Sequence, residues 1–163
     1  MVEYHFIQTG LQKGEYCIYT THEDDVQLIE KKMADFGIDI EGYKRTKKLY
    51  VCRISDPRLD PLGLLQGIEN LRRSIIGESK RPIRIVSRFI RNIESEEDKL
   101  ANMFVERTVH SSFEKYNGSF MCPYPVSNIQ SAIEGAWMQN HLRNHHTAIF
   151  IFKGDKGLAI DLP

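Results

Sequence analysis

Short apolar segments that alternate with longer amphipathic segments place the strongest constraint on the fold of this chain. The apolar segments are rich in β-branched and aromatic residues and are mostly apolar on both faces, which is typical of strands covered by helices on both sides. Five such segments occur, at residues 15–20, 48–54, 83–89, 119–124 and 147–152. This pattern predicts five strands in an α/β domain.

Amphipathic segments separate these strands and predict the helices. Apolar residues recur at helical spacing at about residues 22–36, 61–78, 95–116 and 127–144. Residues typical of helix ends support the assignment, because Pro61 lies near one start and Gly37 and Gly118 follow two ends. Each helix is long enough to cross over a sheet, so right-handed connections predict a three-layer fold with a largely parallel sheet and helices on both faces.

The two ends of the chain depart from a simple repeat of strand and helix. Tyr4, Ile7 and Leu11 have helical spacing and Gly14 follows them, so the chain is expected to begin with a helix. A nucleotide-binding α/β fold begins with a strand, and we therefore expect an upstream strand and loop to be lacking from this sequence. At the other end, residues 152–163 predict a turn and a short antiparallel edge strand.

Length and composition favour a single domain over residues 1–163 without a global attraction to nucleic acid. The 22 Lys and Arg residues balance 22 Asp and Glu residues, so the formal net charge is zero. The longest apolar stretches are far shorter than the roughly 20 residues that span a bilayer, and the N-terminal residues lack a signal-peptide core. Three widely spaced cysteines indicate reduced thiols rather than a disulfide framework. We expect a cytoplasmic protein without membrane contact.

Three motifs of this chain have counterparts in a known family. In the first, a helix ends in Gly-Leu and then Gly-Glu before a strand of the Cys-x-Tyr type; its residues are Gly10, Leu11, Gly14, Glu15, Cys17 and Tyr19. In the second, a late strand places Cys122 before Tyr124. The third, LRNHHTAIF, is similar to a terminal Leu-x-x-His-Pro-x-Val-Ile pattern, with His145 at the histidine position and His146 at the proline position. Together these motifs resemble the MEDS sensory domain and, more widely, the RecA/KaiC-like superfamily.

The resemblance implies a RecA/KaiC-like fold, and the first chemistry that it raises is ATP hydrolysis. A phosphate-binding loop needs G-x-x-x-x-G-K-[ST], but no glycine of this chain is followed by lysine. The acid that positions magnesium normally closes an apolar strand, whereas the segment IRIV is followed by Ser87 and Arg88. The dinucleotide-binding G-x-G-x-x-G and hydrolase G-x-S-x-G motifs are also absent. We therefore expect a catalytically silent relative that uses no cofactor and does not hydrolyse ATP.

The candidate ligand site lies where the parallel strands end. Ligands of α/β sheets bind beyond the carboxyl ends of the strands, so Cys122 and Tyr124 are expected to border a pocket. Glu15, Tyr19 and His145 complete the candidate ligand-binding set, through their match to the family motifs. Two alternatives stay open. Cys122 is either a small buried hydrophobic residue or a ligand-binding or redox-sensing thiol. Glu15 either binds ligand or makes a structural hydrogen bond, and the sequence favours the hydrogen bond.

Three histidines precede the last long apolar segment, in HLRNHH. His141 and His145 share a helix face, and neutral imidazoles bind zinc, copper or nickel, so one interpretation is a metal site completed by Cys122 or His110. The other is that the histidines favour the C-terminal end of the helix, with His145 fixing the turn into the strand. Because a fourth ligand is not evident, the sequence favours the structural interpretation and no bound metal.

Basic residues concentrate in one stretch, at Arg72, Arg73, Lys80, Arg81, Arg84, Arg88 and Arg91. With Phe89 among them, Arg81, Arg84, Arg88 and Arg91 form a candidate site for phosphate or single-stranded nucleic acid. The alternative is a solvated helix end and strand edge balanced by neighbouring acids. The sequence favours this alternative, so nucleic acid is not an expected partner.

These features predict a non-catalytic sensory or signal-transduction module. It is expected to bind a small ligand or a partner protein, and the bound state then alters contacts with a partner signalling domain or subunit. A sheet edge left open by the missing first strand also predicts a homo-oligomer. Two alternatives stay open: a RecA/KaiC-like paralogue that binds ATP or nucleic acid together with a partner subunit, and an enzyme that uses Cys122 and His145 as a nucleophile pair.

Overall fold

The structure is a computed structural model that describes residues 2–22, 26–77, 82–111, 117–124, 136–151 and 157–162. Two compact units divide the chain. The sheet unit comprises Met1–Arg91 and Glu114–Tyr124, and the hairpin unit comprises Asn92–Phe113 and Pro125–Pro163. The single domain expected over residues 1–163 stays a prediction. No helix among the described residues is both long enough and apolar enough to cross a membrane.

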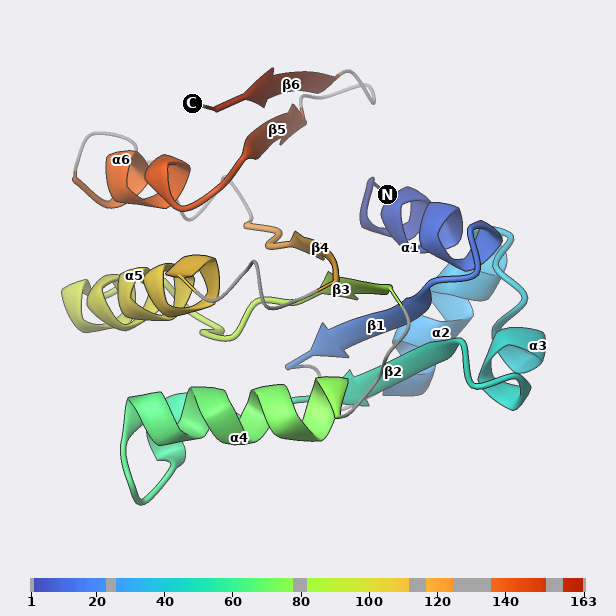
Figure 1. The fold of residues 1–163 in the computed structure, drawn as a ribbon, viewed down its shortest axis with the longest axis horizontal. Helices are drawn as coiled ribbons and strands as arrows, with labels where there is room; N and C mark the ends of the chain where they lie inside the picture. The colour runs from blue at the N-terminus through green and yellow to red at the C-terminus, as the bar shows by residue number, and fades with distance from the viewer. Residues whose placement is uncertain are drawn as a thin grey trace. The chain divides into compact units, whose positions relative to one another are not determined.

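A parallel sheet of four strands forms the centre of the sheet unit (Figure 1). Its order is β2-β1-β3-β4, and the strands are β1 (Tyr16–Thr21), β2 (Leu49–Arg53), β3 (Ile83–Val86) and β4 (Gly118–Met121). The helices of this unit are α1 (Val2–Gln12), α2 (Val26–Asp35), α3 (Ile40–Arg45) and α4 (Leu64–Ile76), with a short 3-10 helix η1 (Pro57–Leu59). The predicted α/β fold with a largely parallel sheet is confirmed.

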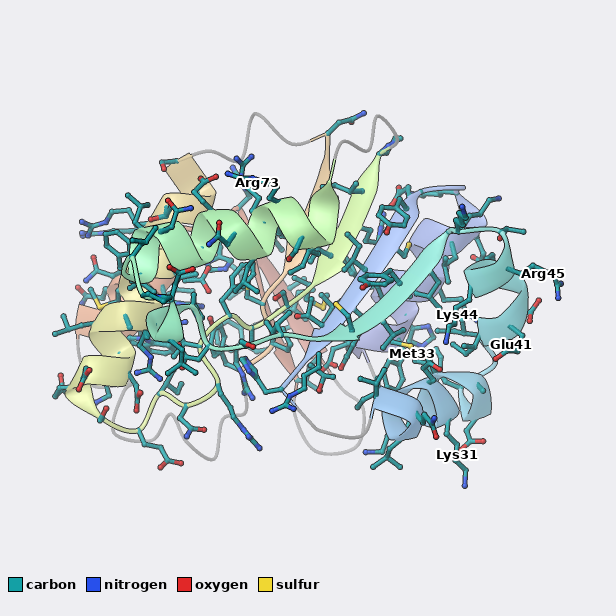
Figure 2. All side chains as sticks on the ribbon, turned by 90° about the horizontal axis from the view of Figure 1, so that it is seen from below. Lys31, Met33, Glu41, Lys44, Arg45 and Arg73 are labelled. Atoms are coloured by element: carbon teal, nitrogen blue, oxygen red, sulfur yellow. The ribbon has the colours of Figure 1, made fainter. Side chains whose placement is uncertain are left out.

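Side chains that alternate along the strands cover both faces of the sheet. On β1, Cys17 and Tyr19 join a core with α1, α2 and α3, whereas Ile18 joins the core that α4 forms on the opposite face. This alternation follows from the two-residue period of a strand. Met33 of α2 is fully buried, while Lys31 of the same helix points away from the sheet (Figure 2). The sheet is therefore the middle of three layers, as the sequence predicts.

The hairpin unit contains two helices and an antiparallel strand pair: α5 (Glu96–Ser111), α6 (Ala136–Arg143), β5 (Thr147–Ile151) and β6 (Gly157–Asp161). The predicted antiparallel C-terminal strand is confirmed as β6. The expectation that residues 147–152 form a fifth strand of the parallel sheet is wrong, because β5 pairs with β6 in a separate sheet. Residues of β5 alternate between exposed and half-buried, whereas the two central strands of the parallel sheet, β1 and β3, are almost entirely buried.

The helices lie where the amphipathic pattern predicts them, with shorter bounds. The described parts of α2, α4, α5 and α6 fall within the expected ranges, and α1 ends before Gly14, whose φ of 78° is left-handed. Residues 112–116 and 127–135, which the pattern also assigns to helices, lie outside the described residues. The pattern did not predict α3, because so short a helix shows no repeat. It begins at a cap in which the Asp39 side chain accepts a hydrogen bond from Gly42 N.

A buried ion pair joins β3, the start of β1 and α1. Arg84 Nε donates to Glu15 Oε2 at 2.6 Å, and Arg84 Nη2 donates to Glu15 Oε1 at 3.2 Å. The third nitrogen, Nη1, donates to the Phe6 carbonyl at 3.2 Å, and the guanidinium carbon lies 4.5 Å from the centre of the Phe6 ring. The Arg84 and Glu15 side chains are only 10% and 17% exposed, so each charge depends on the other for compensation.

Gly10 of α1 leaves room for this pair. A Cβ atom at residue 10 would lie 2.6 Å from Arg84 Cδ and 2.7 Å from Cys17 Sγ. These separations are too short for non-bonded atoms, so a larger residue would push α1 away from the sheet. Gly10, Glu15 and Cys17, which belong to the first sequence motif, therefore lie around one buried guanidinium.

We predict that Arg84→Ala lowers the free energy of unfolding by about 3 kcal/mol, because it leaves the Glu15 carboxylate buried without its charge partner. Arg72→Ala is the control. Its ion pair with Glu69 joins side chains that are 42% and 39% exposed, and the loss should cost less than about 1 kcal/mol. Urea unfolding followed by circular dichroism measures both values. Equal losses in the two variants would contradict a special role for the buried pair.

Candidate functional site

The carboxyl ends of β1 and β3 form the candidate functional site of the sheet unit. The strand order β2-β1-β3-β4 means that the chain leaves β1 toward β2 on one side and leaves β3 toward β4 on the other. The connections after these two neighbouring strands therefore run in opposite directions. Ligands of open α/β sheets bind in the crevice at such a point.

Polar side chains bridge β1 and β3 at this point. Thr20 Oγ1 donates to Ser87 Oγ at 2.7 Å, and both residues are buried. His22 Nε2 lies 2.6 Å from the Arg88 carbonyl oxygen, so this nitrogen carries the proton of the hydrogen bond. The two bonds hold the strand ends together and place hydroxyl and imidazole groups along one edge of the sheet. Sequence reasoning missed Thr20 and His22, although polar residues that close an apolar strand were a usable signal.

Charged groups surround His22. Burial lowers the pKa of His22 below its ordinary value, and the charges of Arg88 and Arg91 act in the same direction. Burial alone would raise the pKa of Asp56, but hydrogen bonds from Arg58 hold it below its ordinary value. Arg58 Nε lies 3.0 Å from both carboxylate oxygens of Asp56. At neutral pH His22 is therefore neutral and Asp56 is ionised, with its charge already matched by Arg58.

Three of the residues that the sequence assigns to ligand binding fall into different units. Cys122 and Tyr124 follow β4, and because the sheet is parallel they lie at the same edge as Thr20 and Ser87. His145 follows α6 in the hairpin unit. The predicted ligand role of Cys122 and Tyr124 is thus compatible with the position of the polar strand ends.

Glu15 and Tyr19, the other two residues assigned to ligand binding, have partners inside the sheet unit. Glu15 precedes β1, so it lies at the amino edge, where it pairs with Arg84. Tyr19 is buried in the core, and its hydroxyl donates to Glu3 Oε2 of α1 at 2.6 Å. Burial, and then the charge of Glu3, raises the pKa of Tyr19. The structural hydrogen bond considered for Glu15 is present, and both residues hold α1 against the sheet.

The arginines considered for phosphate binding are also divided. Arg84 is buried, and its guanidinium contacts Glu15 and the Phe6 carbonyl. Arg88 and Arg91 follow β3 at the carboxyl edge, where Arg88 is half-buried and Arg91 is exposed. Arg81 lies outside the described residues. Phosphate binding by Arg88 and Arg91 stays a prediction.

A second group of polar residues lies between α5 and α6 in the hairpin unit. Glu106 of α5, His141 of α6 and His145 each offer one ligand atom, and these atoms lie within 4.8 Å of one another. Glu106 and His141 are buried, and the His145 side chain is 23% exposed. Sequence reasoning paired the two histidines but missed Glu106, because no local spacing connects residues on separate helices.

Contacts fix the orientation of these histidines. His145 Nδ1 lies 2.7 Å from the His141 carbonyl oxygen, and His145 Nε2 lies 3.5 Å from Glu106 Oε2. The Trp137 and His141 rings stack with centroids 4.7 Å apart, and Trp137 Nε1 donates to Asn102 Oδ1 at 3.2 Å. Burial, followed by the effect of His145, lowers the pKa of His141 to about 3, so this ring is neutral at neutral pH. The bond from His145 to the last turn of α6 agrees with its predicted role in the turn.

One family model matches residues 1–146 of the chain, and its description is MEDS: MEthanogen/methylotroph, DcmR Sensory domain. The chain belongs to the MEDS family. The sequence resemblance to MEDS is confirmed, and the wider link to RecA/KaiC-like proteins stays a prediction.

A solved structure shares the fold of this MEDS domain. It is the crystal structure of the uncharacterized protein PH0321 from Pyrococcus horikoshii in complex with an unknown peptide, and the TM-score is 0.57. The similarity covers 98% of this chain and 76% of that chain at 11% sequence identity, so it concerns the fold alone. No curated protein matches the sequence of this chain.

Two thiols of the MEDS domain should react slowly in the folded state. Burial raises the pKa of Cys17 to about 12 and that of Cys52 to about 11, from an ordinary value of 9.0. At pH ~8 we predict that iodoacetamide alkylates both at least about tenfold more slowly in the native chain than in guanidinium chloride, because the thiolate is the nucleophile. Peptide mass spectrometry measures the rates, and equal rates would contradict the burial.

The raised thiol pKa values also determine how these two cysteines change the free energy of unfolding at alkaline pH. Above pH ~9 the unfolded chain releases the protons of Cys17 and Cys52 while the folded chain keeps them, so these groups lower stability as the pH rises.

Proposed function

We propose that this MEDS domain is a non-catalytic sensory module that binds a small carboxylate or phosphate anion at the carboxyl ends of β1 and β3. The observation that carries the proposal is the pair of hydrogen bonds, Thr20 to Ser87 and His22 to Arg88, at the point where the connections diverge. Membership of a sensory-domain family supports the sensory role.

The groups at this edge suit an anion. Arg88 brings a planar guanidinium, whose donors match the geometry of carboxylate and phosphate oxygens. Arg91 adds positive charge close enough to affect His22. Asp56 opposes this charge little, because Arg58 already forms hydrogen bonds with both of its oxygens. The result is an edge that attracts a negative ligand.

Residues from neighbouring elements complete the proposed site. The Ser87 hydroxyl accepts from Thr20 and keeps its own proton as a donor to the ligand, whereas the one N–H of neutral His22 is already bonded to the Arg88 carbonyl and fixes the backbone there. Cys122 and Tyr124, which follow β4, border it at the same edge of the sheet. The presence of few polar groups at a strand end is typical of small-molecule sites.

The bound anion signals by favouring one arrangement of the strand ends. The bonds at Thr20 and His22 link two connections that leave the sheet in opposite directions. An anion that draws the Arg88 side chain toward itself moves the backbone whose carbonyl accepts from His22. A partner signalling domain, or a second copy of the chain, contacts these connections and responds to the shift. The size of the response depends on how much more tightly the ligand binds one arrangement of the strand ends than the other.

Thermal unfolding with added sodium phosphate or sodium acetate tests the proposal, with sodium chloride at equal ionic strength as the reference. We predict a saturable rise in melting temperature with at least one of the two anions. The rise should be lost in Arg88→Ala and kept in Arg45→Ala. Arg45 is an exposed arginine at the end of α3, before β2 begins and thus at the amino edge of the sheet (Figure 2).

Two outcomes would contradict the proposed function. The first is a melting temperature that neither anion raises above the chloride reference. The second is an equal rise in the Arg88→Ala and Arg45→Ala variants, which would indicate binding by general surface charge. Hydrolysis of ATP with magnesium by the purified chain would contradict the non-catalytic part.

A further inference from the structure

The contact between His145 and Glu106 brings two hydrogen-bond acceptors together. His145 Nδ1 lies 2.7 Å from the His141 carbonyl oxygen, and a carbonyl can only accept, so Nδ1 carries the proton. In the neutral ring the other nitrogen, Nε2, then has a lone pair and no proton. It lies 3.5 Å from Glu106 Oε2, which also only accepts when ionised. These two atoms repel unless a cation, either a proton or a metal ion, lies between them.

The separation of these atoms fits a shared metal ion. Zinc binds imidazole nitrogen and carboxylate oxygen at about 2.0–2.2 Å in a tetrahedron, which places neighbouring ligand atoms about 3.3–3.6 Å apart. The 3.5 Å between His145 Nε2 and Glu106 Oε2 falls in this range. The ligand atom of His141 lies within 4.8 Å of both and supplies the third member of the group.

Surrounding residues hold the ligands in the form that a metal needs. Trp137 stacks on the face of the His141 ring, with the ring centroids 4.7 Å apart. Asn102 in turn accepts a hydrogen bond from Trp137. The carbonyl of His141 fixes the tautomer of His145. Partners of this kind orient metal ligands in known sites.

We propose that Glu106, His141 and His145 form a binding site for a divalent transition-metal ion, and that zinc fits it best. Two imidazole nitrogens and one carboxylate oxygen are a donor set that zinc accepts, with a water molecule at the remaining position. The ion ties α5 to α6 and thereby stabilises the hairpin unit. This assignment adopts the metal interpretation of His141 and His145 that the sequence left as the alternative, with Glu106 as the added ligand.

Calorimetric titration of the EDTA-treated full chain with zinc chloride tests the site. The wild-type chain should bind one zinc ion, and its melting temperature should rise with zinc. Substitution of residues that only hydrogen-bond to metal ligands already weakens metal binding by about 10–100-fold. Glu106→Gln and His145→Gln, which remove ligands, should therefore each lower the zinc affinity at least about tenfold. His5→Gln is the control and should leave the affinity unchanged, because His5 is an exposed histidine of α1.

Cobalt(II) binding gives a second measurement. It uses only the wild-type chain, so it does not require any variant to fold. A four-coordinate site of this kind should produce the intense visible absorption of tetrahedral cobalt(II), and excess zinc should abolish it. Absence of zinc binding would overturn the proposal. Equal zinc affinity in the wild type and both ligand variants, or cobalt bound only with the weak spectrum of an octahedral ion, would also overturn it.

Discussion

A single buried guanidinium organises the sheet unit. Arg84 lies on β3, and its hydrogen bonds reach Glu15 before β1 and the carbonyl of Phe6 on α1. A charge in this position is costly unless its partners are in place, so the pair constrains how the three elements meet. In the resulting register Tyr19 is opposite Val86, and the next residues, Thr20 and Ser87, are joined by a hydrogen bond at the carboxyl edge. The ion pair at one edge thus fixes the geometry of the candidate site at the other.

The two candidate sites in this MEDS domain differ in chemistry and in their relation to the fold. The edge site depends on strand order, because the divergence after β1 and β3 is a property of the topology. The histidine cluster depends on side chains from two helices that the chain brings together, with a buried glutamate as the third member. We propose an exchangeable anion for the first site and a tightly held cation, which stabilises its own unit, for the second.

The sequence predicts what depends on periodicity and misses what depends on pairing. The strands β1 to β4 and the helices α2, α4, α5 and α6 follow from apolar spacing, because burial on a sheet face imposes that spacing. The last apolar segment has the same composition but pairs only with β6, and composition does not encode the strand's partner.

The partners of charged residues are also not evident from the sequence. The sequence groups Arg84 with a stretch of basic residues, although it alternates with Ile83 and Ile85 on a buried strand. Its partner Glu15 was considered for a structural hydrogen bond without the arginine being identified. Glu106 carries no local signal at all, because its neighbours His141 and His145 come from a later part of the chain.

Amide hydrogen exchange in Glu15→Gln, compared with the wild type, tests the central claim that the Arg84 ion pair holds the sheet unit together. We predict that amides of α1, β1 and β3 lose protection together, including those of Thr20 and Ser87 at the far edge, while α5 and α6 keep theirs. Loss of protection confined to the amides next to residue 15 would contradict it.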